Sequence, residues 1–136
     1  MAKTILIIED NDSLRKVYSA RLELDGYQVL QATTASQAQD LLQNHLVDIL
    51  LLDIMLPDKS GLDFLKNLRQ NSRFATLPVI MLTQLPDELA FDKSRELFIH
   101  GYLIKDQTTL DELSQRIKLA LSETSPNQAS GEDSPD

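Results

Sequence analysis

The sequence contains no cysteine, only two histidines and fewer basic than acidic side chains. Without cysteine the chain cannot form disulfides, cysteine-ligated zinc sites, iron–sulfur clusters or a thiol nucleophile. Two histidines are too few for a structural zinc site. The 13 Lys and Arg against 21 Asp and Glu give a formal net charge of −8, the wrong sign for clamping a nucleic-acid backbone. We therefore expect no direct nucleic-acid binding, and the missing thiols fit a reducing, cytoplasmic location.

Long hydrophobic runs are also missing. The first apolar run, residues 5–8, ends at Glu9 and is far too short for a signal peptide or a membrane-spanning helix, so nothing predicts export or membrane anchoring. Apolar residues make up 42% of the 136-residue chain, which suits one folded domain. We expect this domain over residues 1–122. Residues 123–136 are acidic and lack large apolar side chains, so we expect a disordered tail or a truncated linker there.

Five short apolar runs alternate with segments of helical periodicity. The runs are residues 5–8, 29–30, 49–52, 79–82 and 102–104. Their continuous apolar character predicts strands that are buried on both faces of a sheet. Apolar residues spaced three and four apart mark amphipathic helices at Leu14–Leu22 (with Val17 and Tyr18), Ala35–Leu42, Leu62–Leu68 and Leu110–Leu121, and Thr109 with Glu112 forms a capping box. Residues 86–98 show no single apolar stripe, but Pro86, Asp87 and Glu88 suit a first helical turn, so we expect a helix there as well. This alternation predicts a doubly wound α/β fold, a five-stranded parallel sheet with five helices in a three-layer αβα sandwich.

Polar side chains follow four of the five runs. Glu9 and Asp10 follow the first run, Asp53 the third, Thr83 the fourth and Lys105 the fifth. Ligands of open parallel sheets bind beyond the carboxyl ends of the strands, so these side chains should converge. Neighbouring carboxylates repel one another, and a hard divalent cation such as Mg²⁺ relieves the repulsion while also binding phosphate oxygens. The sequence therefore predicts a magnesium site beside a phosphate site.

The source of the phosphate must be another molecule, because the chain has no glycine-rich phosphate loop. A carboxylate can act as the nucleophile in phosphoryl transfer and form an aspartyl phosphate. Asp53 is the best candidate, with Lys105 and Thr83 donating to the phosphoryl oxygens and Glu9 with Asp10 holding the metal. Taken singly, each residue could be only a helix cap, a turn residue or a surface charge. Their positions after separate strands favour the functional interpretation.

Four segments resemble the receiver domain of response regulators in two-component signalling. They are Ile-Leu-Ile-Ile-Glu-Asp-Asn from residue 5, Leu-Leu-Leu-Asp-Ile-Met-Leu-Pro from residue 50 with Gly61 behind it, Ile-Met-Leu-Thr ending at residue 83, and Tyr-Leu-Ile-Lys ending at residue 105. The resemblance covers about residues 3–122. It implies the flavodoxin-like strand order 2-1-3-4-5. It also implies that a sensor histidine kinase or a phosphotransfer protein donates a phosphoryl group to Asp53.

The same resemblance implies a ligand set and a switch. Mg²⁺ would be held by Asp10, Asp53 and the backbone carbonyl of Met55, with Glu9 acting through water. Thr83 and Tyr102 would be the switch pair, which reshapes the face made by the helix at 86–98, the strand at 102–104 and the helix at 110–121. That face would bind a downstream protein effector and could form a homodimer. The domain would promote only its own phosphorylation and dephosphorylation.

Three residues depart from the usual receiver pattern. Glu9 stands where Asp is commoner, Gln84 stands where a small residue is typical, and Asp106 stands where Pro usually brings a cis peptide. None of these departures removes a group that the chemistry requires.

Two other functions stay open at this point. One is a receiver-like scaffold that binds partners without phosphorylation, and the complete acceptor set argues against it. The other is a metal-dependent phosphatase or another hydrolase on a similar α/β frame, which would want a second carboxylate shortly after the nucleophile, where Met55 stands. No helix-turn-helix pattern follows Ser122, so DNA binding would need another domain or a partner.

Overall fold

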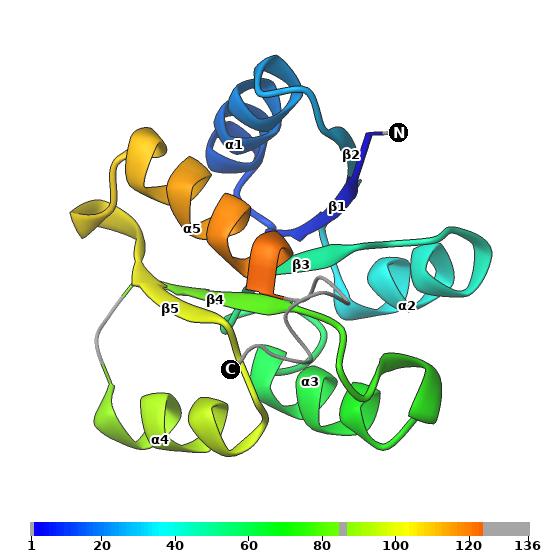
Figure 1. Cartoon of the computed structure of the whole chain (residues 1–136). Helices are drawn as coiled ribbons and strands as arrows, with labels where there is room; N and C mark the ends of the chain where they lie inside the picture. The colour runs from blue at the N-terminus through cyan, green and yellow to red at the C-terminus, as the bar shows by residue number, and fades with distance from the viewer. Residues whose placement is uncertain (1, 85–86, 124–136) are drawn as a thin grey trace, which may run out of the picture.

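The computed structural model describes residues 2–84 and 87–123, which form a parallel sheet between two layers of helices (Figure 1). The strands are β1 (Thr4–Ile8), β2 (Gln28–Ala32), β3 (Ile49–Asp53), β4 (Val79–Thr83) and β5 (Gly101–Ile104). All four strand pairs are parallel, and the order across the sheet is β2-β1-β3-β4-β5. The predicted flavodoxin-like order is therefore confirmed.

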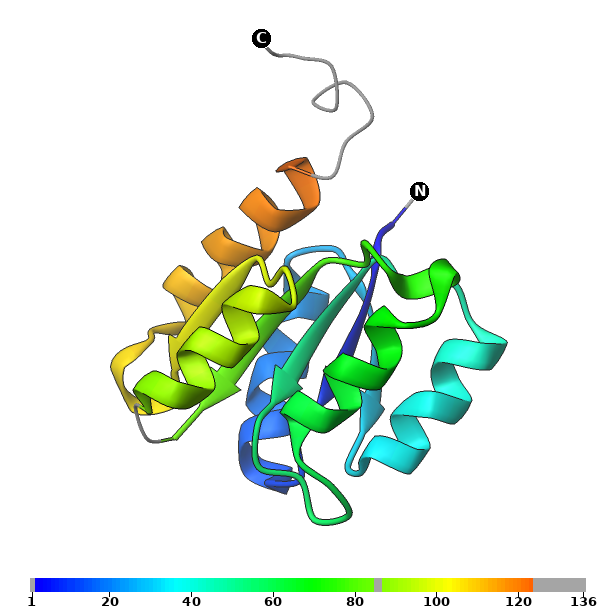
Figure 2. The same ribbon diagram turned by 90° about the horizontal axis from the view of Figure 1, so that it is seen from below.

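Within the described ranges, five α-helices connect and follow the strands. They are α1 (Asp12–Leu24), α2 (Ala35–Asn44), α3 (Gly61–Arg69), α4 (Glu88–Glu96) and α5 (Leu110–Glu123), and two short 3-10 turns lie at Ser72–Phe74 and Lys105–Gln107. Figures 1 and 2 show α1 and α5 on one face of the sheet and α2, α3 and α4 on the other. The predicted three-layer sandwich is confirmed. None of the helices in the described part of the chain has the length and apolar character needed to cross a membrane.

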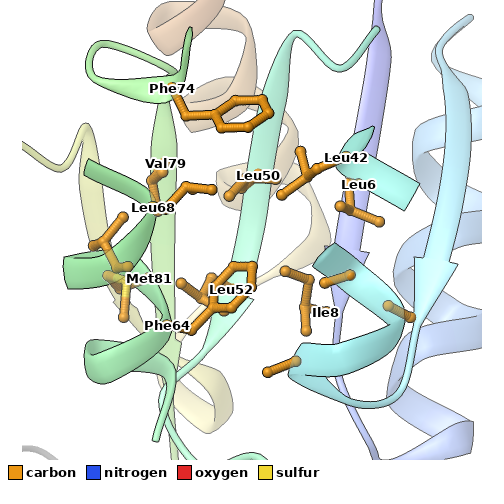
Figure 3. Packing of buried hydrophobic residues seen from close by; sticks show 14 residues of the cluster. Leu6, Ile8, Leu42, Leu50, Leu52, Phe64, Leu68, Phe74, Val79 and Met81 are labelled. Carbon is orange, nitrogen blue, oxygen red and sulfur yellow. The ribbon is translucent and has the colours of Figure 1, made fainter. Parts of the chain in front are cut away.

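The core consists of two hydrophobic clusters, one on each face of the sheet. Successive side chains of a strand point to opposite faces. Leu6 and Ile8 of β1 therefore join the cluster under α2 and α3, which Figure 3 shows with Phe64 and Leu68 of α3 packed against the sheet. Ile5 and Ile7 join the cluster under α1 and α5. The continuous apolar runs thus supply both clusters from the same strands.

Burial on both faces holds for the inner strands β1, β3 and β4 and is wrong for the other two runs. Val29 and Leu30 of β2 are only half-buried, as are residues 102–104 of β5. These two strands form the edges of the sheet and each has a single neighbouring strand. Their short apolar runs are therefore covered only in part.

The helix ends follow the expected capping chemistry, with two corrections. In α5 the backbone N–H of Glu112 donates to Thr109 Oγ1 and that of Thr109 donates to Glu112 Oε1, so the predicted capping box is confirmed. Val17 was expected on the buried stripe of α1 but is 47% exposed, and the buried positions beside it are Tyr18 and Leu22. Helix α4 begins at Glu88 with Asp87 as its cap, whereas Pro86, predicted in its first turn, lies outside the described residues.

Two further expectations concern residues 105–136. The peptide bond between Lys105 and Asp106 is trans, because no cis peptide occurs among the described residues. Helix α5 ends at Glu123, and the predicted tail beyond it lies outside the part of the chain that the structure describes. The domain boundary at residue 122 stays a prediction.

Gly61 has no room for a side chain. A Cβ there would lie far inside contact distance of the Asp53 backbone carbonyl oxygen, because α3 begins directly against the end of β3. We expect Gly61→Ala to lower the free energy of unfolding by about 2 kcal/mol, a typical cost of overpacking against backbone. Urea denaturation measures this loss. Gly101→Ala is the matched control, since its Cβ would meet only side chains at 3.4 Å or more. Equal stabilities of the two variants would contradict the account.

Candidate functional site

Polar side chains converge at the carboxyl edge of the sheet, where β1, β3, β4 and β5 end. Glu9 follows β1, Asp53 is the last residue of β3, Thr83 is the last residue of β4, and Lys105 follows β5. The register aligns these ends, because Asp53 pairs with Leu82 of β4. Residues far apart in the sequence are therefore brought to one edge.

Lys105 is the centre of the arrangement. Its Nζ lies 2.6 Å from Oε1 of Glu9 and 2.9 Å from Oδ2 of Asp53. The Glu9 side chain is fully buried and that of Asp53 is 4% exposed, so both carboxylates are largely removed from water. A single ammonium group bridges two buried carboxylates, and charge-assisted bonds of this kind are stronger than neutral ones.

Burial and charge act against each other in this cluster. Burial raises the pKa of Glu9, while hydrogen bonds from Lys105 and from the Asn11 backbone N–H oppose the rise and the Asp53 charge adds to it. Burial by itself would lower the pKa of Lys105, but the two carboxylates outweigh it, and the pKa of Lys105 is raised. The ammonium form is therefore held firmly.

The carboxylates of Glu9, Asp10 and Asp53 form a donor set for a hard cation. One oxygen of each lies within 4.8 Å of the others, and Asp10 is exposed to solvent. With all three ionised, Lys105 neutralises only one of the three negative charges. Oxygen ligands with excess negative charge and an open, wet side are what Mg²⁺ prefers. The residues present thus fit a magnesium ion.

The cluster lies in a cleft of about 420 Å³. Its lining comprises Glu9, Asp10, Asn11, Asp53, Met55, Leu56, Pro57, Gln84 and Lys105. Gln84 is exposed at its rim, directly after the buried Thr83. The cleft is roomy and open enough for a phosphoryl donor to approach, with Gln84 beside the path.

Two loops hold the acidic residues in place. Asn11 caps α1 with its side chain and donates its backbone N–H to Oε2 of Glu9 at 3.0 Å. The Met55 backbone N–H donates to Oδ1 of Asp53, also at 3.0 Å. The backbone N–H of Met55 thus lies beside the Asp53 carboxylate.

Arg15 is a site residue that the sequence reasoning missed. Its buried guanidinium donates to the backbone carbonyl of Glu9 at 3.0 Å, to Gln31 Oε1 at 3.0 Å and to Asp12 Oδ1 at 2.7 Å. It ties the loop after β1 to the end of β2. A charged residue in a helix is usually exposed, so no sequence pattern signals this role.

Thr83 and Tyr102 lie together beside the cleft. Tyr102 pairs with Met81 across β4 and β5, its hydroxyl is buried, and its ring meets Phe91 of α4 edge-on at a centroid distance of 5.1 Å. Burial raises the pKa of the Tyr102 hydroxyl, the charge of Asp87 adds to the rise, and hydrogen bonding with the Thr83 side chain opposes it. Tyr102 therefore contacts both the end of β4 and helix α4.

The two histidines do not join the site. His45 follows α2 and lines a different hollow, which also includes Lys3 and Asp48. The backbone N–H of His100 donates to the carbonyl of Val79 at the opposite end of β4 from Thr83. Neither histidine therefore lies at the carboxyl edge of the sheet.

The fold and this acidic edge define the class of protein, a signalling receiver built on the flavodoxin-like sheet. The family model for the response regulator receiver domain matches residues 5–118, so the chain belongs to this family. Receiver domains are phosphoacceptors of two-component signalling, and they bind Mg²⁺ at an acidic pocket. This chain has an acidic cluster of Glu9, Asp10 and Asp53 at the carboxyl edge of its sheet.

Individual relatives agree with this assignment. The chain is 32% identical over 129 residues to the phosphate regulon transcriptional regulatory protein PhoB of Pseudomonas aeruginosa, which covers 95% of this chain and 56% of that protein. It is 42% identical over 101 residues to the transcriptional regulatory protein CpxR of Escherichia coli, covering 74% of this chain and 42% of the relative. The chain thus spans about half the length of the curated relatives that it matches.

Solved structures show the same fold. A putative response regulator from Chloroflexus aurantiacus superposes with a TM-score of 0.83 and 31% identity, covering 90% of this chain and 99% of that one. A CheY-like receiver domain protein from Methanospirillum hungatei gives a TM-score of 0.84 at 27% identity, with 90% and 96% of the two chains covered.

Removing the central ammonium should destabilise the fold. We expect Lys105→Met, measured by urea denaturation in EDTA, to lower the free energy of unfolding by about 3 kcal/mol, because two buried carboxylates lose their partner. The pKa of Glu9 then rises further above its ordinary value of 4.5, so above that pH the native state binds more protons than the unfolded chain. Its stability should therefore increase as the pH falls from about 7 toward about 5.

Two further variants control this experiment. Lys118→Met removes an exposed lysine and should be nearly neutral. Adding Glu9→Gln to Lys105→Met removes one unpaired charge and should recover part of the loss. A Lys105→Met protein as stable as Lys118→Met would show that the ion pairs contribute nothing to stability.

Proposed function

We propose that this receiver domain accepts a phosphoryl group on Asp53 from a sensor histidine kinase or a phosphotransfer protein. One observation carries the proposal: a buried Lys105 ammonium bridges Asp53 and Glu9 at the carboxyl edge of the sheet. This arrangement places a carboxylate that can act as the nucleophile next to a cation where phosphoryl oxygens would arrive.

The transfer step joins groups at this edge of the sheet to the donor's phosphohistidine. An oxygen of Asp53 attacks the phosphorus of the donor's phosphohistidine, and a P–O bond forms as the P–N bond breaks. The histidine nitrogen keeps the electron pair and takes up a proton from solvent. Lys105 then donates to one phosphoryl oxygen and the Thr83 hydroxyl to another.

Mg²⁺ completes the site in this proposal. Asp10, Asp53 and the backbone carbonyl of Met55 would hold the ion, and Glu9 would act through water. The ion supplies positive charge to the transferring oxygens. The 4.8 Å grouping of the three carboxylates supports this assignment.

The output is a changed protein-binding face on α4, β5 and α5. Thr83 and Tyr102 are the proposed switch pair, and the edge-on contact of Tyr102 with Phe91 links that pair to α4. The face would bind a downstream protein effector or a second copy of the chain. Cytoplasmic location belongs to the same proposal, because sensor kinases present their phosphohistidine there.

The relatives suggest one setting for this output. PhoB and CpxR are transcriptional regulatory proteins about twice the length of the matched region. The receiver could control such an output through a further domain or a partner. The phosphorylation-independent scaffold is not favoured, since the ion-paired acceptor set has little use in a protein that never takes a phosphoryl group.

Intact mass after incubation with acetyl phosphate tests the acceptor. The wild-type protein should gain one phosphoryl group only when Mg²⁺ is present, and Asp53→Asn should gain none while keeping its fold. Asp40→Asn, an exposed change on α2, should behave as the wild type. Size-exclusion chromatography of the same samples reports any dimer. Native-level labelling of Asp53→Asn, or no labelling of a folded wild type, would refute the proposal.

Gln84 should slow access to the phosphoryl site. It lies at the rim of the cleft beside Asp53 and Lys105, so Gln84→Ala should accelerate both phosphorylation by acetyl phosphate and subsequent hydrolysis. Time courses of intact mass give both rates. Gln115→Ala, an exposed change on α5, is the control and should leave them unaltered. Unchanged rates in Gln84→Ala would mean that the side chain does not obstruct the path.

A further inference from the structure

Asp58, in the loop between β3 and α3, is bonded to the N-terminus of α2. Its Oδ1 accepts the backbone N–H of Ala35 at 2.9 Å, and its Oδ2 accepts that of Ser36 at 3.0 Å. These are the first residues of α2, whose N–H groups have no partner within the helix. The hydrogen bond from Ala35, with that from Ser36, holds the pKa of Asp58 below its ordinary value, and the helix dipole favours the same ionised form.

Helix α2 already has its own cap. Thr34 Oγ1 accepts the backbone N–H of Gln37 at 3.1 Å, so the helix does not depend on Asp58 alone. Asp58 is 22 and 23 residues away in sequence from the two N–H groups that it binds. Bonds over that separation fix the loop to the helix as much as they cap the helix.

The loop that carries Asp58 is closed at its base and lines the cleft. Gly61 N–H donates to the Ile54 carbonyl at 2.7 Å, and Met55 and Ser60 form an antiparallel bridge. Met55 N–H donates to Oδ1 of Asp53. Residues 55–57, which run from this base to Asp58, line one side of the cleft. This side of the cleft is thus held at two points, one at β3 and the other at α2.

We propose that Asp58 is a positioning residue of the phosphoacceptor site, which anchors the tip of the β3–α3 loop to α2 and so fixes the Met55 backbone beside Asp53. The expected effect of Asp58 on Mg²⁺ binding rests on the proposed function, whereas the anchoring of the loop to α2 does not. Substitutions in the surroundings of metal ligands typically weaken metal binding by about tenfold or more.

The test compares Asp58→Ala with Thr34→Ala, which weakens the same helix end without touching the loop. Calorimetry measures the Mg²⁺ dissociation constant, and NMR hydrogen exchange measures the amides of Met55 and Gly61. We expect both variants to lose thermal stability. Only Asp58→Ala should accelerate exchange at these two amides and weaken Mg²⁺ binding by about tenfold. Asp58→Asn keeps one acceptor oxygen, so its amide exchange and Mg²⁺ affinity should fall between those of the wild type and Asp58→Ala. It replaces Asp58→Ala in the test if the alanine variant does not fold.

The outcomes separate this inference from the proposed function. Equal effects of Asp58→Ala and Thr34→Ala on exchange and on Mg²⁺ binding would reduce Asp58 to a helix cap and overturn the inference. Normal Mg²⁺ binding with unchanged loop exchange in Asp58→Ala would overturn it too, while the phosphoacceptor function stood. A wild type that binds no Mg²⁺ and takes no phosphoryl group would overturn the function, and faster exchange in Asp58→Ala alone would still support the anchoring.

Discussion

The contact of Lys105 with two buried carboxylates is the interaction on which the site depends. Glu9 directly follows β1 and Asp53 ends the neighbouring strand β3, so the parallel sheet itself brings their carboxylates together. Without a cation the low dielectric would protonate one of them or push them apart. The ammonium group lies 2.6 Å from Glu9 and 2.9 Å from Asp53 and offsets part of this repulsion, and with all three carboxylates ionised it leaves a net negative charge for a divalent ion.

Much of this arrangement could be predicted from the sequence because it follows from strand ends. Continuous apolar runs mark strands, and the residue after each run must lie at the carboxyl edge of a parallel sheet. Glu9, Asp53 and Lys105 were found in this way. The strand order came from the family resemblance. The same logic failed at the sheet edges, where apolar runs such as Val29–Leu30 are only half-buried because no pattern within a run tells an edge strand from an inner one.

The contacts that could not be predicted join charged side chains to distant backbone. Arg15 holds the Glu9 carbonyl, and Asp58 holds the first amides of α2. Arg69 of α3 similarly donates to the carbonyls of Leu97 and Phe98 at the end of α4. In sequence each looks like an ordinary surface charge, and backbone groups carry no residue-specific signal. Only the packed loops reveal that these three residues attach neighbouring segments to one another.

The geometry also indicates how the proposed phosphorylation of Asp53 would affect helix α4. In the proposed function the Thr83 hydroxyl donates its one proton to a phosphoryl oxygen. A hydrogen bond to a charged oxygen is stronger than one to a neutral group. Thr83 would therefore turn toward the phosphoryl group, and its neighbour Tyr102 already meets Phe91 of α4 with its ring. Lys105 follows Tyr102 closely along the chain and would shift its contacts to the same phosphoryl group, so both changes act on β5 together.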